Sequence, residues 1–259
     1  MIIVKSQTEI RKIADACRIV AEVLEGLKSH VTEGMATADI ERFVDEGIRK
    51  RGAGAAFRGY RGYPSSVCVS VNDQVIHGIP SRGMKLKSGD IVGLDIGTVL
   101  DGFYGDAAMT IPVGNVRAGN AHLLKITEEA LMLGIEKAVV GNRIGDISSA
   151  VQVHVEKHGY SVVRAFVGHG IGRSLHEDPQ VPNYVDPKCN QKLRAGMTIA
   201  IEPMVNAGRA DVKILKDGWT VVTQDGSLSA HFEHTILITE GEPEILTWQP
   251  KMPFSLKAA

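Results

Sequence analysis

A ten-residue segment occurs twice in this chain, and each copy ends on an acid. Residues 86–95 align without a gap on residues 193–202, the first copy ending at Asp95 and the second at Glu202. Self-similarity of this kind predicts two related halves packed about a pseudo-twofold axis, with a site where they meet. The alternative is chance similarity between two short strands. A length of 259 residues accommodates two fused halves within one α/β-sized unit.

The order of helix and strand patterns is similar in the two halves. Ser6 and Glu9 form a capping box before an amphipathic helix, and a second helix around residues 40–48 ends at Gly52. Strands are expected at residues 67–71 and in a hairpin over residues 89–111 that turns at Asp101-Gly102. The order then recurs, with helices at 119–139 and 146–159 and strands at 197–201, 219–223 and 232–238. Helices that precede turn-connected strands favour an antiparallel α+β fold over alternating βαβ units.

Strand alternation places the acids on a face with few bulky side chains. Within residues 91–97 the apolar side chains point one way, and Asp95 points the other way between Gly93 and Gly97. A two-residue turn would pair Asp106 with Gly97, so Asp106 would share the face of Asp95. In the second copy of the segment, Glu202 likewise points away from the apolar side chains of its strand. Two like charges this close repel each other unless a cation lies between them.

Solvated surface acids are the simpler explanation, because Asp and Glu are mostly exposed. Acids at matched positions on strongly apolar strands instead favour one buried cleft, where carboxylates need partners or a metal. His169 lies among glycines in residues 168–172, which leaves its ring room to face a ligand, although a packed structural histidine is the alternative. The glycine spacing does not match a phosphate-binding loop, because Leu175 occupies the third glycine position. Four carboxylates and one imidazole suit two divalent ions and hydrolytic chemistry: Asp95, Asp106, His169, Glu202 and Glu233.

Composition excludes several other classes of protein. The 29 basic and 30 acidic residues give a net charge of -1, so nucleic acid and anionic membrane are not expected partners. Three cysteines without a CxxC pair, Cys17, Cys68 and Cys189, argue against a disulfide framework and a structural zinc site. No signal peptide pattern and no apolar run of about 18 residues occur, which predicts a cytoplasmic protein.

Eight short motifs, taken together and in order, give the chain a specific resemblance over essentially its whole length. They occupy residues 63–68, 77–80, 95–97, 105–106, 168–172, 176–179, 201–203 and 232–235. In these motifs the chain resembles the type I methionine aminopeptidases. The resemblance implies the α+β pita-bread fold, with two pseudo-symmetric halves, a curved antiparallel sheet and helices on its outer face. It also implies one catalytic domain over residues 1–259, with approximate halves 1–115 and 116–250.

The resemblance further implies a dinuclear metal centre containing Co, Mn, Fe or Zn. Asp95 would bind one ion, and Asp106 and Glu233 would bridge both. His169 and Glu202 would complete the ligands of the other ion. A hydroxide bridging the two metals would attack the carbonyl after the initiator methionine of a nascent protein whose second residue is small. Glu202 would also shuttle protons.

The resemblance assigns the remaining site residues as well. His77 would contact the substrate backbone, and His176 would hydrogen-bond the scissile carbonyl oxygen. The methionine pocket would be formed, together with these two histidines, by Tyr60, Tyr63, Cys68, Phe166, Leu175 and Trp219, for each of which core packing is the alternative. Leu175, commonly aromatic in the family, and Arg61, often histidine, depart from the pattern. Asn72 and Ser229 would bind one Na or K ion through backbone oxygens.

Two other functions remain open. An Xaa-Pro aminopeptidase or dipeptidase would use the same fold and ligands, although the short chain and residues 63–68 favour methionine. A non-catalytic peptide-binding relative is opposed by the intact ligand set, because burying these acids without a counter-ion is costly. The chain lacks a zinc-binding extension and a long insertion between His169 and Glu233, which favours the compact bacterial-like form. A monomer with transient ribosome contact is expected.

Overall fold

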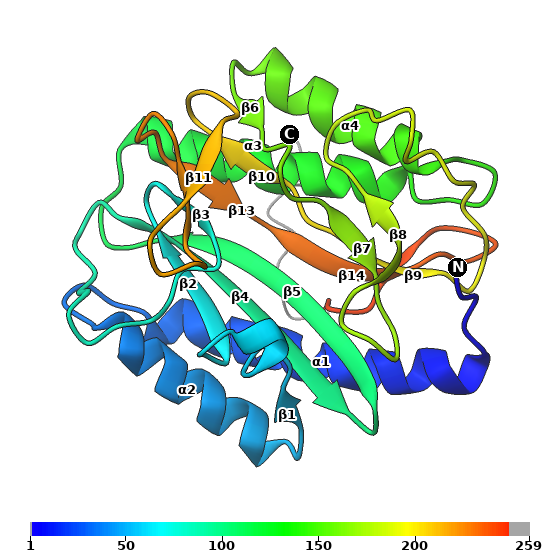
Figure 1. Cartoon of the computed structure of the whole chain (residues 1–259), viewed down its shortest axis with the longest axis horizontal. Helices are drawn as coiled ribbons and strands as arrows, with labels where there is room; N and C mark the ends of the chain where they lie inside the picture. The colour runs from blue at the N-terminus through cyan, green and yellow to red at the C-terminus, as the bar shows by residue number, and fades with distance from the viewer. Residues whose placement is uncertain (1, 249–259) are drawn as a thin grey trace.

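The structure, a computed structural model, describes residues 2–248. Its largest sheet has the strand order β1-β4-β5-β14-β9-β7-β8, with β2 also paired to β4 and β15 to β14 (Figure 1). All these pairs are antiparallel. The strands are β1 (Gly54–Ala55), β2 (Val67–Val71), β4 (Ile91–Leu100), β5 (Phe103–Pro112), β7 (Gly168–Gly170), β8 (Glu177–Val181), β9 (Thr198–Ile201), β14 (Glu233–Leu237) and β15 (Glu244–Ile245).

Helices from each half lie along opposite sides of the view in Figure 1. They are α1 (Gln7–His30) and α2 (Thr37–Lys50) in the first half, and α3 (Ala118–Glu136) and α4 (Ile144–Lys157) in the second. Two small sheets complete the fold, with the strands β13 (Ser229–His231), β10 (Met204–Asn206) and β6 (Ser161–Val162), and β11 (Val212–Ile214), β12 (Val221–Thr223) and β3 (Gln74–Ile76). No described helix combines the length and apolarity that a membrane span requires.

The repeat in the sequence extends well beyond ten residues in the structure. Helices α2 and α4 both have 14 residues, and α4 begins 107 positions after α2, the same offset that relates residues 86–95 to 193–202. Two isolated bridges, Ala36 to Lys85 and Arg143 to Lys192, are related by that offset too. So are Gly89 and Gly196, both at positive φ in the turn before the repeated strand. The two halves therefore meet between β5 and β14.

The apolar faces of the strands are buried against the helices. Val92, Leu94 and Ile96 are fully buried in one cluster with side chains of α1 and α2. In the second half, Ile199 and Ile201 pack in the same way with residues of α3 and α4. Because side chains alternate along a strand, the acids of both repeats lie on the face turned away from these helices. The predicted parity is confirmed.

Capping explains where the helices begin. The capping box of α1 is present, with Glu9 Oε2 accepting from the Ser6 backbone at 2.9 Å. Helix α4 begins at Ile144, two residues before the predicted start, because Asp146 accepts from the backbone N–H of Arg143 at 2.7 Å and so lies inside the first turn.

Other predicted boundaries differ from the structure by a few residues, and local turns explain two of them. Helix α3 ends at Glu136 rather than at residue 139, because the residues after Glu136 form a tighter turn. The strand predicted at 219–223 begins at Val221, because Asp217 accepts from the backbone N–H groups of Trp219 and Thr220 at 2.9 Å and holds a turn there.

Candidate metal centre

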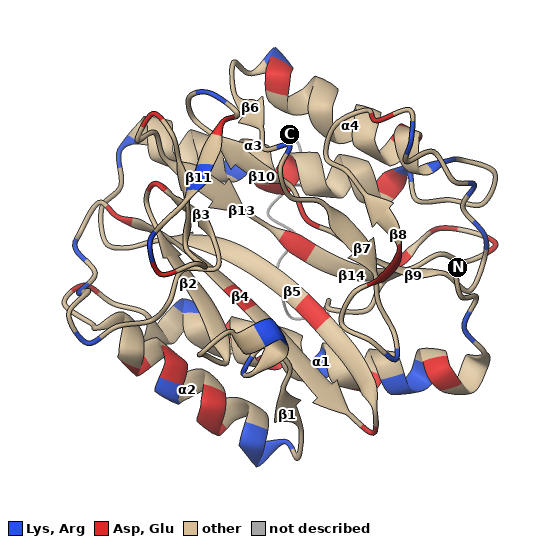
Figure 2. Ribbon diagram, viewed as in Figure 1, with Lys and Arg blue, Asp and Glu red and all other residues tan. Residues whose placement is uncertain are grey.

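Five strands of the central sheet bring the predicted ligands into one pocket. Acidic residues occur within β4 and β5 and at the start of β14, where the two halves meet (Figure 2). The ligands come from β4, β5, β7, the end of β9 and β14, and all line the same pocket: Asp95, Asp106, His169, Glu202 and Glu233.

Strand register sets the spacing of the three acids in the centre of the sheet. Asp106 pairs with Gly97, as the turn at Asp101-Gly102 predicts. Ala108 pairs with Asp95 on one side and with Glu233 on the other. Paired residues of an antiparallel sheet project from the same face, so a methyl group separates the two carboxylates. This leaves space for a ligand in front of Ala108.

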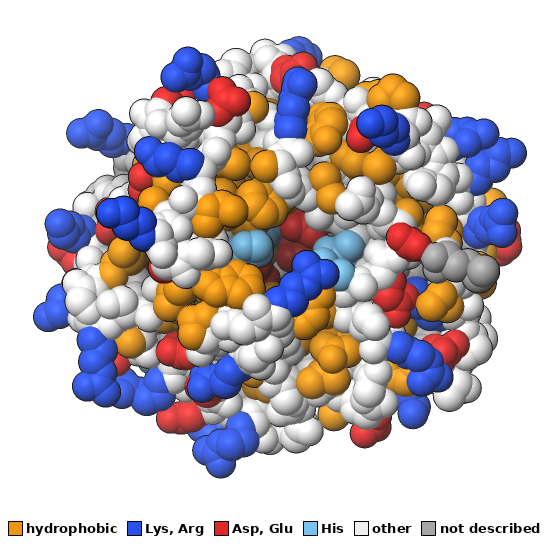
Figure 3. All heavy atoms as spheres, in the orientation of Figure 1, with side chains coloured by type: hydrophobic (Ala, Val, Ile, Leu, Met, Phe, Trp, Pro, Cys, Tyr) orange, Lys and Arg blue, Asp and Glu red, His pale blue; other side chains and the backbone are white. Residues whose placement is uncertain are grey.

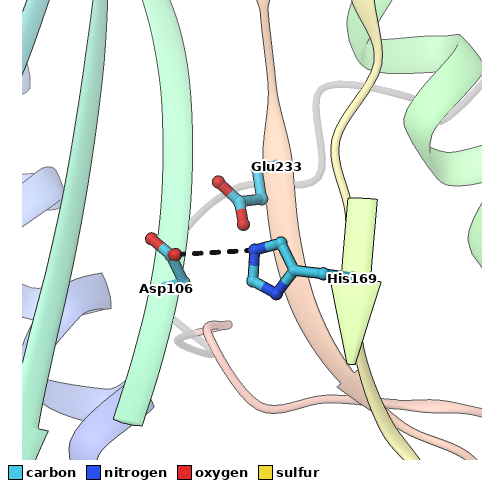
Figure 4. Close-up of side chains that lie close together, drawn as sticks. All are labelled: Asp106, His169 and Glu233. Atoms are coloured by element: carbon cyan, nitrogen blue, oxygen red, sulfur yellow. Dashed lines mark ion pairs between the residues drawn. The ribbon is translucent and has the colours of Figure 1, made fainter. Parts of the chain in front are cut away.

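The side chains of Asp106, His169 and Glu233 point toward one another (Figure 4). One ligand atom from each lies within 4.8 Å of the others. His169 Nε2 is 3.9 Å from Asp106 Oδ2 and 3.5 Å from Glu202 Oε1. His169 Nδ1 donates to the Gly170 carbonyl oxygen at 2.9 Å, so Nε2 carries the lone pair that faces the acids.

The carboxylates are buried without adequate compensation. Burial raises the pKa of Asp95 to about 7. Burial, followed by the negative charges of neighbouring acids, raises the pKa values of Asp106, Glu202 and Glu233 well above the usual range. Asp95 Oδ1, Asp106 Oδ1 and Glu233 Oε1 have no hydrogen-bond partner among the described residues. Buried carboxylate oxygens that lack hydrogen bonds and lie near an imidazole lone pair are suitable ligands for divalent cations.

An apolar chamber adjoins the acids. Seven of the eight predicted substrate-binding residues line the same pocket as the ligands: Tyr60, Tyr63, Cys68, His77, Leu175, His176 and Trp219. Tyr63 is fixed by donating to the Gly78 carbonyl oxygen at 2.9 Å, and its ring meets Trp219 edge-on, with centroids 5.1 Å apart. The chamber wall is therefore rigid at this point.

Phe166 is not among the side chains that line the pocket with the other seven, and its part in binding the substrate stays a prediction. It packs edge-on against His77, with ring centroids 5.8 Å apart, and joins the cluster around Val163 and Val221. Phe166 thus contacts a histidine that lines the pocket.

Histidine side chains flank a hollow on the face shown in Figure 3, with acidic side chains at its floor and a basic side chain over its rim. His176 Nδ1 lies 3.0 Å from the Tyr60 hydroxyl, and its ring centroid is 4.1 Å from that of His169. Burial, aided by His169 and Arg61, lowers the pKa of His176 to about 3. Burial alone lowers the pKa of His77 to about 4. Both rings are neutral at pH 7 and can each donate one N–H.

Comparison with known proteins identifies the family. The model of metallopeptidase family M24 matches residues 11–240. The chain belongs to metallopeptidase family M24. A methionine aminopeptidase of Clostridium perfringens is 53% identical over 247 residues, covering 95% of this chain and 99% of the relative. That of Bacillus subtilis is 49% identical over 247 residues, covering 95% of this chain and 99% of the relative.

Solved structures of M24 peptidases share the fold. A methionine aminopeptidase of Thermotoga maritima superposes with a TM-score of 0.94 at 47% identity, covering 96% of this chain and 100% of that chain. The prolidase of Pyrococcus furiosus has a TM-score of 0.78 at 24% identity, covering 95% of this chain but 66% of that chain, and shows the fold alone. The α+β pita-bread fold with two pseudo-symmetric halves is thereby confirmed.

Two residues of this M24 site were missed in the sequence. Phe57 lines the pocket, and His231 places Nε2 3.8 Å from Glu202 Oε2. His231 precedes Glu233 by two positions, so strand parity could have indicated it. Phe57 lies outside any periodic segment, and no sequence signal marks it.

The predicted monovalent-cation residues lie side by side in the M24 chain. Asn72, at φ 58°, accepts the Ser229 backbone N–H on its carbonyl oxygen at 2.9 Å. The Asn72 side chain donates to Asp90 Oδ1 at 2.9 Å. The two residues are brought together, and a cation at this place stays a prediction.

The stability of the metal-free M24 chain should be highest near pH 6.5 and fall above about pH 7. Acids with raised pKa bind more protons when folded than when unfolded, so stability is lost as pH rises through the folded pKa values. The folded pKa is about 7 for Asp95, and those of Asp106, Glu202 and Glu233 are raised in the same direction. Histidines with lowered pKa act in the opposite direction, but only below the unfolded value of about 6.5. Between pH 7 and 8 the acids act alone.

Thermal unfolding in EDTA and in Mn²⁺ from pH 5 to 8 would measure this dependence. The melting temperature in EDTA should fall between pH 7 and 8, and Mn²⁺ should remove that fall by neutralising the acids. A constant melting temperature in EDTA across that interval would contradict the assigned protonation of the cluster.

Proposed function

We propose that this chain removes the N-terminal methionine from nascent polypeptides whose second residue is small. The observation that carries the proposal is the cluster of partnerless carboxylate oxygens next to a chamber lined by Tyr63, Cys68, Leu175 and Trp219. Relatives 44–53% identical to the chain are methionine aminopeptidases by name. Prolidase-like relatives share only the fold.

The five converging residues would hold two divalent ions, drawn from Co, Mn, Fe and Zn: Asp95, Asp106, His169, Glu202 and Glu233. Such a pair supplies a water of lowered pKa and polarises the scissile carbonyl. The protein contributes the proton transfers. Glu202, whose pKa is raised by burial, would accept the proton of the attacking water and give it to the leaving amine.

Two neutral histidines would orient the substrate. His176 would donate one N–H to the scissile carbonyl oxygen, where negative charge develops in the transition state. His77 would donate to the substrate backbone on the other side of the pocket. A neutral donor suits this place, because an imidazolium would compete with the cations for the same acids.

The chamber would select methionine by shape and polarity. Tyr63, Cys68, Leu175 and Trp219 offer an apolar surface of fixed geometry to an unbranched thioether side chain. The second residue would lie above the acids, close to Tyr60 and His176, where a long side chain would meet the rim.

A peptide panel tests the proposal. With Mn²⁺ or Co²⁺ supplied, we expect cleavage of Met-Ala-Ser and Met-Gly peptides, little cleavage of Met-Lys peptides, and none in EDTA. The assay measures the methionine released, and a matched peptide that begins with norleucine is used for comparison. Cleavage of Xaa-Pro peptides with Met-Ala-Ser left intact would assign the chain to the rival prolidase-like activity.

The setting of this activity follows from the same proposal. Residues 1–259 would act as one catalytic domain with halves near 1–115 and 116–250, as a monomer in the cytoplasm with transient ribosome contact. Asn72 and Ser229 would hold one Na or K ion. A net charge of -1 gives no electrostatic reason for binding DNA or membrane.

A further inference from the structure

His231 is a buried histidine that neither the metal cluster nor the chamber accounts for. It ends β13, its exposed fraction is 4%, and its Nε2 has no hydrogen-bond partner in the part of the chain that the structure describes. That atom lies 3.8 Å from Glu202 Oε2. The other oxygen, Glu202 Oε1, is 3.5 Å from His169 Nε2. The Glu202 carboxylate therefore lies between two imidazoles.

The backbone fixes His231 relative to Glu202. His231 pairs with Met204, two residues after Glu202, so β10, the strand that follows Glu202, is hydrogen-bonded to the strand that ends on His231. The His231 backbone N–H also donates to Thr110 Oγ1 at 2.9 Å, and that hydroxyl donates to the His231 carbonyl oxygen at 2.8 Å. Three strands thus hold the ring in place.

A buried polar atom without a hydrogen-bond partner destabilises a protein, so the retention of His231 calls for an explanation. The separation of 3.8 Å exceeds a hydrogen bond of about 2.9 Å by less than one ångström, which a small rotation of the Glu202 side chain closes. Carboxylates that hold metals are themselves oriented by hydrogen bonds from neighbouring groups.

We propose that His231 is a positioning residue for Glu202. Its Nε2–H donates to Glu202 Oε2 in the working enzyme and turns Oε1 toward His169 and the cations. The expected effect on kcat rests on the proposed function, whereas the expected effect on metal affinity does not. The alternative is a histidine that only fills space in the core.

Two substitutions at His231 separate positioning from packing. In His231→Gln the amide nitrogen reaches the place of imidazole Nε2 and keeps the donor, whereas His231→Leu keeps bulk and removes the donor. We expect His231→Leu to bind Mn²⁺ about 10–100-fold more weakly and to lose a similar factor in kcat with little change in KM. His231→Gln should stay within about threefold of the unchanged protein.

Calorimetric titration of the metal-depleted protein with Mn²⁺ measures the affinity, and Met-Ala-Ser cleavage measures kcat and KM. His154→Leu is the matched control, because it removes the hydrogen bond from His154 Nε2 to Glu129 on the outer helices, away from the pocket. If the leucine variant does not fold, His231→Met repeats the test. Equal Mn²⁺ affinities of the glutamine and leucine variants, whether high or low, would overturn the inference. If the unchanged protein cleaves no Met-Ala-Ser, the proposed function fails while the affinity contrast still decides the role of His231.

Discussion

Replacing Asp106 by asparagine should reduce kcat/KM for Met-Ala-Ser by more than about 10³-fold, equivalent to at least about 4 kcal/mol of transition-state stabilisation. Asp106 is 4% exposed and lies between Asp95 and Glu233, where its charge would bind both ions. An amide there removes that charge and can turn an N–H toward the cations. Metal content measured after dialysis should fall from two ions per chain to one or fewer.

The same substitution should have the opposite effect on the metal-free protein. Removing one of several crowded buried acids relieves repulsion, so metal-free Asp106→Asn should melt at a higher temperature than the unchanged protein at pH 8. Asp101→Asn is the matched control, because it changes an exposed acid at the turn of the same hairpin. An unchanged metal content in Asp106→Asn would contradict the ligand assignment.

Replacing Lys5 by methionine should lower the free energy of unfolding by about 3–5 kcal/mol, the cost of breaking a buried ion pair from one side. Lys5 Nζ donates to Glu177 Oε2 at 2.8 Å, and the two side chains are only 4% and 9% exposed. Glu177 Oε1 also accepts the backbone N–H groups of Arg173 and Ser174. The pair thereby anchors the loop that carries His176.

Urea unfolding at pH 7 in EDTA measures the loss without a contribution from bound metal. Arg18→Met serves as the control, because it removes an exposed i,i+3 pair with Asp15 and should cost less than about 1 kcal/mol. A loss below 1 kcal/mol for Lys5→Met would mean that water already solvates Glu177. If Lys5→Met is fully folded and still has a lower kcat/KM for Met-Ala-Ser than the unchanged protein, the broken ion pair has displaced the loop that carries His176.

Local rules were sufficient for the features that depend on neighbouring residues. The turn at Asp101-Gly102 sets the hairpin register, so the shared face of Asp95 and Asp106 follows from counting positions. The capping box of α1 is encoded by Ser6 and Glu9 alone. The duplicated segment predicts the pseudo-symmetry, because its two strands carry acids at matched parity.

Features that depend on packing between distant segments could not be predicted this way. The packing of Phe166 against His77 depends on a cluster that draws on both halves of the chain. Strand parity could mark His231 as a candidate, but its closeness to Glu202 depends on the pairing of β10 with β13, which joins distant segments. The start of β12 depends on a side-chain turn at Asp217.

The division of the site between the two halves has a consequence for how the protein is made. The proposed ligands occur in the order 95, 106, 169, 202 and 233, so a growing chain carries the complete set only after residue 233 has been synthesised. Until β14 inserts beside β5, Glu233 is missing, and the strands β9 and β7 near Glu202 and His169 have no strand that joins them to β5. With the proposed ligands, the complete metal site would therefore form only after β14 has paired with β5 and β9.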